Sequence, residues 1–330
     1  MVMTLSERAR GAFIGLAVGD ALGSPTEGKT PDQIAERWGR VKDFLSPEQS
    51  GSDDTEYALF SAKLLLTFGK ELTSAHIADA YRKEIINSKN TYKGAGFSEI
   101  IAINNLKKGL EPPASGQHVH SWSDGLAMRV TPYGIACAGD PFSAAHFAKE
   151  DGAVANAGEG IISGQAVAAA VATAMTGADV ETIVRKTFEV IPDDSWTAAS
   201  IRRGVKIGST YDNVWDALKP LHTSIACSYY FWPDIAPEAV GLAFGIITAA
   251  RGQFEDAVLG AVNLGRDTDT IAAIAGSICG ASLGYGAIPE RWSGRMGVSE
   301  GKCISAVKGM DILSVADELS HLAELWSTLK

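Results

Sequence analysis

The chain has 330 residues, of which 46% are hydrophobic and 21% are charged, a composition typical of a folded globular protein. Its net charge of −10 makes nucleic acid and an anionic membrane surface unfavourable partners. The sequence lacks an apolar run of the roughly 20 residues that cross a bilayer. The four cysteines are widely spaced, with neither disulfide nor zinc spacing, so we expect a reducing, cytoplasmic location.

The first predicted helix covers residues 5–23 and carries glycine at positions 11, 15, 19 and 23. Residues four apart lie on one face of a helix, so these glycines form a ridge. Each glycine in a helix interior costs about 0.5–1 kcal/mol relative to alanine. The ridge therefore predicts that another backbone packs closely against this helix. The loop that follows carries Glu27.

The remaining apolar patterns have helical periods, and strand signals are nearly absent. We therefore predict an all-α fold, with residues 1–330 forming a single compact multi-helix domain. The predicted helices cover 54–68, 74–87, a segment ending near 108, 126–138, 141–149, 160–175, 179–191, 195–208, 211–218, 236–250, 254–263, 269–284 and 311–329.

Two of these helices begin with an unusual density of carboxylates and hydroxyls. The early one starts Ser52-Asp53-Asp54-Thr55, and the late one starts Asp267-Thr268-Asp269-Thr270. Acidic residues are favoured at helix N-termini, so a well-capped helix explains either start alone. Two such starts favour a shared site, although their spacing in the sequence does not show that they meet.

Carboxylates that share a site raise one another's pKa or are neutralised by cations. Oxygen donors suit hard divalent cations such as Mg²⁺, and the absence of a nearby Cys or His motif argues against zinc. Two metal ions about 3.5–4 Å apart are typical of sites that activate water. The composition of the two helix starts is therefore consistent with a binuclear metal cleft.

The motifs, in this order, resemble those of the ADP-ribosylglycohydrolase family, and the resemblance covers most of the chain. They comprise residues 11–23 with Glu27, 52–55, 127–130, 265–270 with 272–276, and 288–292. The resemblance implies two Mg²⁺ or Mn²⁺ ions and hydrolysis of the C1″ glycosidic bond of an ADP-ribosyl group. The implied partner is an ADP-ribosylated protein or a small ADP-ribosyl or ribosyl compound.

The resemblance also assigns residues to roles. Glu27 matches a glutamate that orients water or transfers a proton. The matched metal ligands are Ser52, Asp53, Asp54, Asp267, Asp269 and Thr270, with Ser52 in place of a common threonine. The matched substrate-binding positions are Gly94, Gly96, Ser121, Trp122, Ser123, Asp124, Gly125, Met128, Asn156 and Arg266.

Three of the substrate-binding positions depart from the common pattern of the family. Asp124 replaces an asparagine, and its charge would repel a diphosphate unless a cation or Arg129 intervened. Asn156 replaces a histidine, and Arg266 replaces a glycine, which would place a cation beside the metals. We therefore expect the chemistry to be retained, with a leaving group or nucleotide part that can differ. The alternative is a non-catalytic descendant that binds ADP-ribose or serves a structural role.

Overall fold

A computed structural model describes residues 3–89 and 92–328, and the regular structure within these ranges is helical, without a β-sheet. The α-helices are α1 (Leu5–Gly23), α2 (Pro31–Trp38), α3 (Asp53–Phe68), α4 (Ser74–Ala80), α5 (Phe97–Lys107), α6 (Thr131–Ala136), α7 (Pro141–Ala155), α8 (Glu159–Ala174), α9 (Val180–Phe188), α10 (Trp196–Gly208), α11 (Val214–Ile225), α12 (Ala236–Ala249), α13 (Phe254–Val262), α14 (Thr268–Leu283), α15 (Glu290–Ser293) and α16 (Ile312–Thr328). Shorter helical segments are η1 (Ser24–Thr26), η2 (Gly69–Glu71), the π-helical η3 (Tyr81–Ile86), η4 (Ala114–Gly116), η5 (Tyr285–Ala287) and η6 (Ser305–Val307). The all-α prediction is confirmed.

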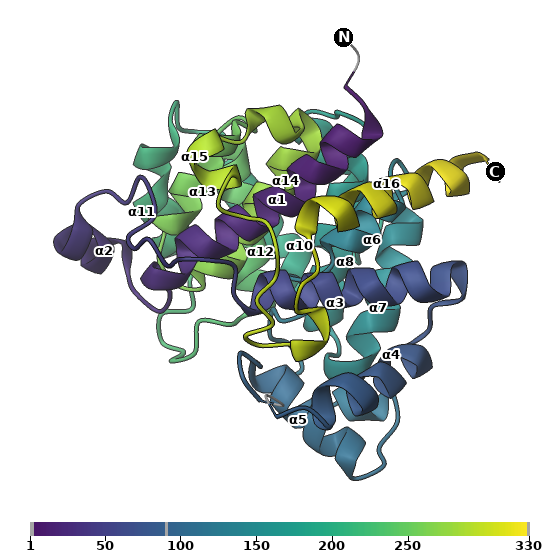
Figure 1. The fold of residues 1–330 in the computed structure, drawn as a ribbon. Coiled ribbons are helices and arrows are strands. Elements are labelled where there is room, and N and C mark those ends of the chain that lie inside the picture. Colours follow the sequence, from purple (N-terminus) through teal and green to yellow (C-terminus); the bar gives the residue numbers. More distant parts are fainter. Residues whose placement is uncertain (1–2, 90–91, 329–330) are drawn as a thin grey trace.

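The centre of the fold is the pair α1 and α14, which come from opposite ends of the sequence and pack along one another (Figure 1). A Cβ atom added at Gly15 would lie 2.2 Å from the carbonyl oxygen of Gly276, and one added at Gly19 would lie 2.1 Å from that of Ala272. The other two glycines of the ridge meet the backbone of the same partner. The predicted close approach of a second backbone is thus confirmed, and α14 is that partner.

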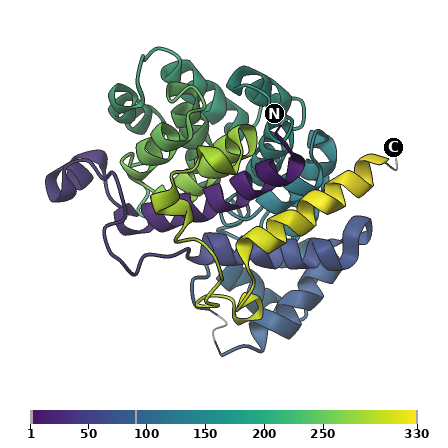
Figure 2. The ribbon, with the colours of Figure 1, turned by 45° about the horizontal axis from the view of Figure 1, so that its top comes forward.

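The other helices surround this pair and bury its remaining faces. From the viewpoint of Figure 2, α1 runs beside α16, with α3 beyond it, and both of these helices contact α1. Most of α8 is buried, as the continuous apolar run predicts, and α8 packs against α6, α7, α9, α12 and α14. Because α1 and α14 are held from all sides, the residues at their ends are fixed relative to one another.

Several segments differ from the predicted helices; α15 was not predicted, and α7 continues to Ala155 rather than ending at 149. The chain forms α2, which was not predicted although Thr30 and Gln33 make a capping box around Pro31. This helix has only eight residues and buries only Ile34, so its apolar pattern is short. The predicted helix over 126–138 is wrong in its first part, because residues 124–129 form turns before α6 begins. The predicted helix over 211–218 instead begins at residue 214 and continues through Pro220 to 225.

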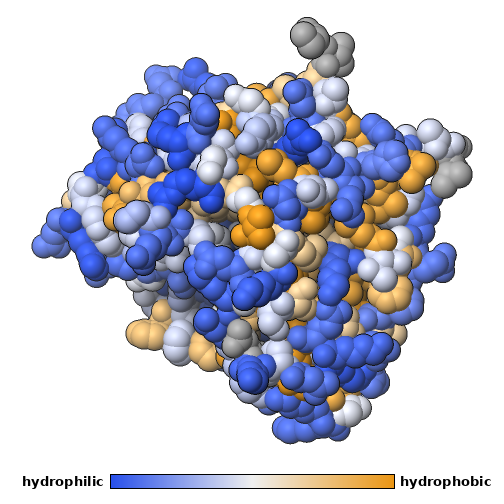
Figure 3. Space-filling view, in the orientation of Figure 1, coloured by the Kyte–Doolittle hydropathy of each residue, from blue (hydrophilic) through white to orange (hydrophobic). Residues whose placement is uncertain are grey.

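The surface in Figure 3 is mostly hydrophilic, with small apolar groups between the charged ones. Among the described residues, we find no helix with both the length and the apolar character that a bilayer crossing requires. The four cysteines, all among the described residues, form no disulfide bond; Cys303 is partly buried and the other three are buried.

Candidate metal centre

The two acidic helix starts meet. Asp54 lies in the first turn of α3 and Thr270 in the first turn of α14, and the Thr270 hydroxyl donates a hydrogen bond to the Asp54 carboxylate over 3.1 Å. Asp267 is the N-cap of α14, where its carboxylate accepts the Thr270 amide. The early and late motifs therefore share one site, which their positions in the sequence could not show.

Asp20 fastens the start of α3 to α1, and sequence reasoning did not place it in the site. Its buried carboxylate accepts hydrogen bonds from the amide and hydroxyl of Ser52 and from the amide and hydroxyl of Thr55. Helix N-terminal amides have no partner within their own helix, and here Asp20 supplies one. The sequence did contain a signal for this role, because Asp20 is the one charged residue in the apolar, glycine-rich stretch 11–23.

The loop that carries Glu27 is held against the start of α14 by backbone contacts. The Gly28 amide donates to the Arg266 carbonyl, and the Arg266 amide donates to the Lys29 carbonyl, over 2.9 and 2.8 Å. Beneath the loop, the Thr26 and Thr268 hydroxyls lie 3.0 Å apart and both hydrogen bond to the carbonyl of Gly23. These contacts explain how a loop residue is placed beside the carboxylates of α14.

Carboxylates line a cavity of about 110 Å³ between these elements. Its lining consists of Glu27, Asp53, Asp54, Gly96, Glu99, Ser123, Asp124, Gly125, Met128, Asp234, Asp267, Asp269 and Thr270. Two triads of carboxylates each have oxygen atoms within 4.8 Å of one another, and Asp269 belongs to both: Asp20, Asp54 and Asp269 form one, and Glu27, Asp267 and Asp269 form the other.

Burial and mutual repulsion raise the pKa values in this cavity. Desolvation, and then the charge of Asp267, raise the pKa of the Glu27 carboxyl to about 7, although the residue as a whole is exposed. Desolvation and the charge of Asp20 raise the pKa of Asp53 to about 7. The pKa of Asp269 lies well above its ordinary value for the same reasons, burial first and then Asp267. Without cations, the folded protein therefore binds protons here that an unfolded chain would release near neutral pH.

The donor set fits hard divalent cations. Every side-chain donor in the two triads is a carboxylate oxygen, and the Thr270 hydroxyl stands beside them. Among the described residues, these carboxylates form no ion pair with a lysine, arginine or histidine side chain. Oxygen ligands without Cys or His suit Mg²⁺ or Mn²⁺ rather than Zn²⁺. Two triads that share one carboxylate are consistent with two neighbouring ions.

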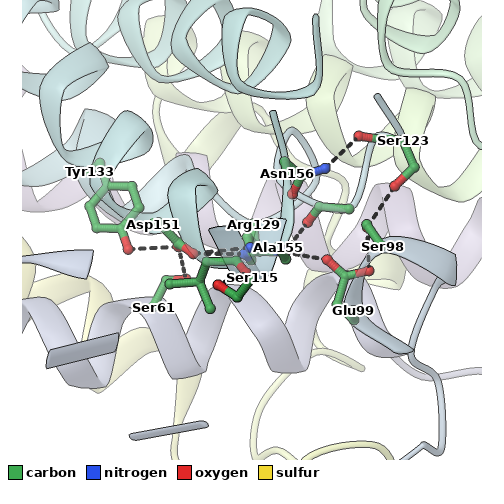
Figure 4. A network of polar contacts seen from close by, with 12 residues as sticks. Ser61, Ser98, Glu99, Ser115, Ser123, Arg129, Tyr133, Asp151, Ala155 and Asn156 are labelled. Atoms are coloured by element: carbon green, nitrogen blue, oxygen red, sulfur yellow. Dashed lines mark hydrogen bonds and ion pairs between the residues drawn. The ribbon is translucent and has the colours of Figure 1, made fainter. Parts of the chain in front are cut away.

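A buried network supports one wall of the cavity (Figure 4). In it Arg129 lies between Asp151 and Glu99 and forms ion pairs with both, at 3.0 and 2.8 Å. Glu99 lines the cavity and accepts the Ser98 hydroxyl, which in turn accepts the Ser123 hydroxyl. All five residues are buried. The network therefore fixes the loop around Ser123, and Arg129 is occupied by its two carboxylate partners.

The predicted substrate-binding residues fall into two groups. Gly96, Ser123, Asp124, Gly125 and Met128 line the cavity with the carboxylates. The other five predicted residues are not part of this lining: Gly94, Ser121, Trp122, Asn156 and Arg266.

Most of this second group holds the surrounding loops. Gly94 packs against Asp53 and Cys303 with a positive φ of 66°, a close approach that suits only glycine. The Asn156 amide donates to the carbonyls of Ser121 and Ser123, so it supports their loop from behind. A substrate contact by any of these residues stays a prediction.

Arg266 holds the aromatic loop that precedes α12. Its guanidinium forms an ion pair with Glu238 and donates to the carbonyls of Tyr230 and Trp232. The Arg266 guanidinium, which we expected beside the metals, therefore pairs with Glu238 instead. The loop in turn packs on Trp122, whose ring meets that of Tyr230 at a centroid distance of 5.2 Å.

Two further cavity residues were missed by sequence reasoning. Glu99 stands three residues after Gly96, in the first turn of α5, and nothing in the sequence separates it from an ordinary helix start. Asp234 follows the aromatic run and reaches the cavity because its loop pairs with the 121–125 loop. The Asp124 amide donates to the Asp234 carbonyl, and Ser123 and Ile235 form an isolated antiparallel bridge.

Comparison with known proteins agrees with this arrangement. The family model described as ADP-ribosylglycohydrolase matches residues 1–328. An uncharacterized protein from Archaeoglobus fulgidus is 34% identical over 87% of this chain and 91% of its own length. The ADP-ribosylarginine hydrolase Tri1 of Pseudomonas putida is 26% identical, over 96% of this chain and 81% of its own. The ADP-ribosyl-[dinitrogen reductase] glycohydrolase of Rhodospirillum rubrum is 24% identical, over 89% of this chain and 91% of its own.

A solved structure titled ADP-ribosylglycohydrolase-related protein complex has the same fold. Its TM-score is 0.68 at 24% sequence identity, and the match covers 97% of this chain and 99% of that one. The family model covers nearly every residue, including both acidic helix starts and the Glu27 loop. The chain therefore belongs to the ADP-ribosylglycohydrolase family.

Proposed function

We propose that this protein hydrolyses the glycosidic bond of an ADP-ribosyl group, or of a related ribosyl compound, with the help of two divalent cations, Mg²⁺ or Mn²⁺. The observation that carries the proposal is the pair of carboxylate triads that share Asp269, with Glu27 in one of them. Family membership and the names of two relatives support the choice of an ADP-ribosyl substrate.

The proposed metal ligands are Ser52, Asp53, Asp54, Asp267, Asp269 and Thr270. When bound, the cations would supply a binding point for ribose hydroxyls and would make a water molecule more acidic. Asp20 would act behind the ligands, because its hydrogen bonds to Ser52 and Thr55 orient the start of α3.

Glu27 is the proposed proton carrier. Its carboxylate lies within 4.8 Å of carboxylate oxygens of Asp267 and Asp269, where it can act as a base toward a water molecule held at the site. In the reaction, the water oxygen bonds to C1″ as the bond from C1″ to the leaving group breaks. Glu27 takes a proton from the water and returns one to the leaving group. The transition state of such a cleavage resembles an oxocarbenium ion, and the surrounding carboxylates suit its positive charge.

Turnover of a panel of ADP-ribosylated arginine and serine peptides and simpler ribosides, with Mg²⁺ or Mn²⁺ present, tests the proposal. We expect Glu27→Gln to lower kcat by about 10²–10⁴-fold while a metal-induced rise in melting temperature remains, because the six proposed ligands are unchanged and glutamine keeps an oxygen donor. Glu36→Gln is the matched control, because Glu36 is exposed on the neighbouring helix α2. Asp269→Ala should abolish both turnover and the metal-induced rise.

The alternative is a non-catalytic member of the family that binds ADP-ribose. All six positions matched to metal ligands keep an oxygen donor, which favours the enzyme. Metal-dependent stabilisation combined with no turnover of any substrate in the panel would favour the binding protein instead.

A further inference from the structure

The carboxylate of Glu56 holds a distant segment of the chain at the start of α3. Glu56 is only 2% exposed and stands two residues after the proposed metal ligand Asp54. One carboxylate oxygen accepts the Lys302 amide over 2.8 Å, and the other accepts the amides of Cys303 and Ile304 over 2.7 Å each. Because a buried amide without an acceptor is costly, these three consecutive hydrogen bonds fix the path of the segment.

The anchored segment supports a loop that reaches the cavity. The Cys303 side chain lies against Gly94, where an added Cβ would be 2.3 Å from the Cys303 Sγ and 3.1 Å from the Cβ of Asp53. Gly94 stands two residues before Gly96, which lines the cavity. In Figures 1 and 2 the segment between α15 and α16 crosses α3, and η6 within it contacts both α3 and η3. A continuous chain of contacts therefore leads from Glu56 through Cys303 to the loop at the cavity.

The segment has an attachment that does not involve Glu56. The Lys63 ammonium, farther along α3, donates to the Ala306 carbonyl over 3.5 Å. Glu56 instead bonds the backbone of Cys303, the residue whose side chain touches Gly94. The first turn of α3 also carries two of the carboxylates that line the cavity. The same turn thus sets the position of the proposed metal ligands and of the Gly94 loop.

We propose that Glu56 is a positioning residue for substrate binding, which acts through Cys303 to hold the loop of residues 94–96 beside the cavity. The inference rests on the proposed function, in which Gly94 and Gly96 are substrate-binding positions. The hydrogen bonds of Glu56 themselves do not depend on turnover. Loss of these bonds should weaken ligand binding and keep the metal site, because Asp20 still holds the start of α3.

The contact between the segment and the loop is tested by the rate at which N-ethylmaleimide labels Cys303, with the labelled peptide identified by mass spectrometry. Glu56→Gln turns an amide NH₂ group toward the backbone amides, and we expect labelling at least about tenfold faster, the ratio for one lost hydrogen bond to a charged group. Glu300→Gln is the matched control, because Glu300 is exposed in the same segment and pairs with the Lys302 ammonium. Labelling of Glu56→Gln at the rate of this control would overturn the proposal.

Calorimetric binding of ADP-ribose to the Mg²⁺-loaded protein tests the effect on the cavity. Glu56→Gln should raise the Kd by about tenfold and keep a metal-induced rise in melting temperature. Cys303→Ala keeps the backbone amides and removes the side chain that touches Gly94, so it should raise the Kd by about fivefold. The double variant should bind no more than about twofold more weakly than Glu56→Gln alone, because both changes break one chain of contacts.

Additive losses in the double variant would show that Glu56 does not act through Cys303, which would overturn the proposal. A purely structural anchor would lower the melting temperature of Glu56→Gln and leave the Kd for ADP-ribose unchanged, with the same consequence. If Glu56→Gln does not fold, Cys303→Ala decides alone, and an unchanged Kd in that variant refutes the positioning of the loop.

Kinetics separate this inference from the proposed function. If the wild-type protein turns over a substrate of the panel, Glu56→Gln should lower kcat/KM by about tenfold, mainly through KM. A loss confined to kcat would overturn the positioning role while the hydrolase assignment stands. A wild-type protein that neither binds ADP-ribose nor turns over any substrate would refute the proposed function, and the labelling of Cys303 would still decide whether Glu56 holds the loop.

Discussion

Replacing Gly19 by alanine tests the central packing of the fold. The added Cβ would lie 2.1 Å from the carbonyl oxygen of Ala272 and 2.3 Å from its carbon, whereas ordinary contact begins at 3.4 Å. The obstacle is backbone, so no side-chain rotation relieves it, and α1 must move from α14 by about 1.3 Å. Overpacking costs about 1–3 kcal/mol where side chains can adjust, and we expect the upper end here, about 3 kcal/mol.

The opposing effect is smaller. Alanine gains about 0.5–1 kcal/mol over glycine in helix propensity, which leaves a net loss of at least about 2 kcal/mol. With an unfolding entropy of about 2.1 cal/mol/K per residue over 330 residues, a net loss of about 2–2.5 kcal/mol lowers the melting temperature by about 3–4 °C. Because Gly19 precedes Asp20, the displacement should also weaken Mg²⁺ binding.

Thermal unfolding followed by circular dichroism, with and without Mg²⁺, measures both effects. The matched control is Gly286→Ala, where an added Cβ meets no atom within 4 Å and the backbone φ is not positive. The control should melt at or slightly above the wild-type temperature. If Gly19→Ala melts within about 1 °C of the control, roughly a third of the expected shift, the reasoning about backbone contact is refuted.

Three further predictions concern charge. In EDTA, the pKa values of Glu27 and Asp53 in the folded protein, about 7, exceed their ordinary values of 4.5 and 3.8. The protonated carboxyl groups therefore stabilise the folded state at low pH, and this stabilisation is lost as the pH rises through 7. Saturating Mg²⁺ should flatten this decline in melting temperature between about pH 4 and 8, and parallel curves in EDTA and Mg²⁺ would contradict a metal site. Arg129→Met leaves two buried carboxylates without their cation and should lower the free energy of unfolding by about 3–5 kcal/mol in urea titrations, whereas a loss below about 1 kcal/mol would show that the network is dispensable. Arg266→Met should speed cleavage after the aromatic residues within 227–235 in limited chymotrypsin digestion, because it removes the donors that hold this loop, and an unchanged cleavage pattern would show that other contacts suffice.

Local sequence patterns determined much of the helical architecture. The glycine ridge predicted a backbone partner for the first helix, and the apolar run after residue 159 predicted a buried helix, because periodicity and steric size act over a few residues. The same patterns placed both acidic helix starts at the correct turns of α3 and α14. The short helix α2 escaped prediction because it has only eight residues and buries only Ile34, although Thr30 and Gln33 form a capping box at its start.

Which polar groups share the cavity was decided by the tertiary structure. Asp20 faces the start of α3 because the glycines bring α1 against α14, and Asp234 reaches the cavity because its loop pairs with residues 121–125. Arg266 lies next to the metal-ligand motif in sequence, yet its side chain turns to Glu238, the buried carboxylate of another helix. The interactions and the desolvation cost of a charged group depend on the atoms that surround it in three dimensions. The partner of a charged side chain therefore cannot be read from its neighbours in the sequence.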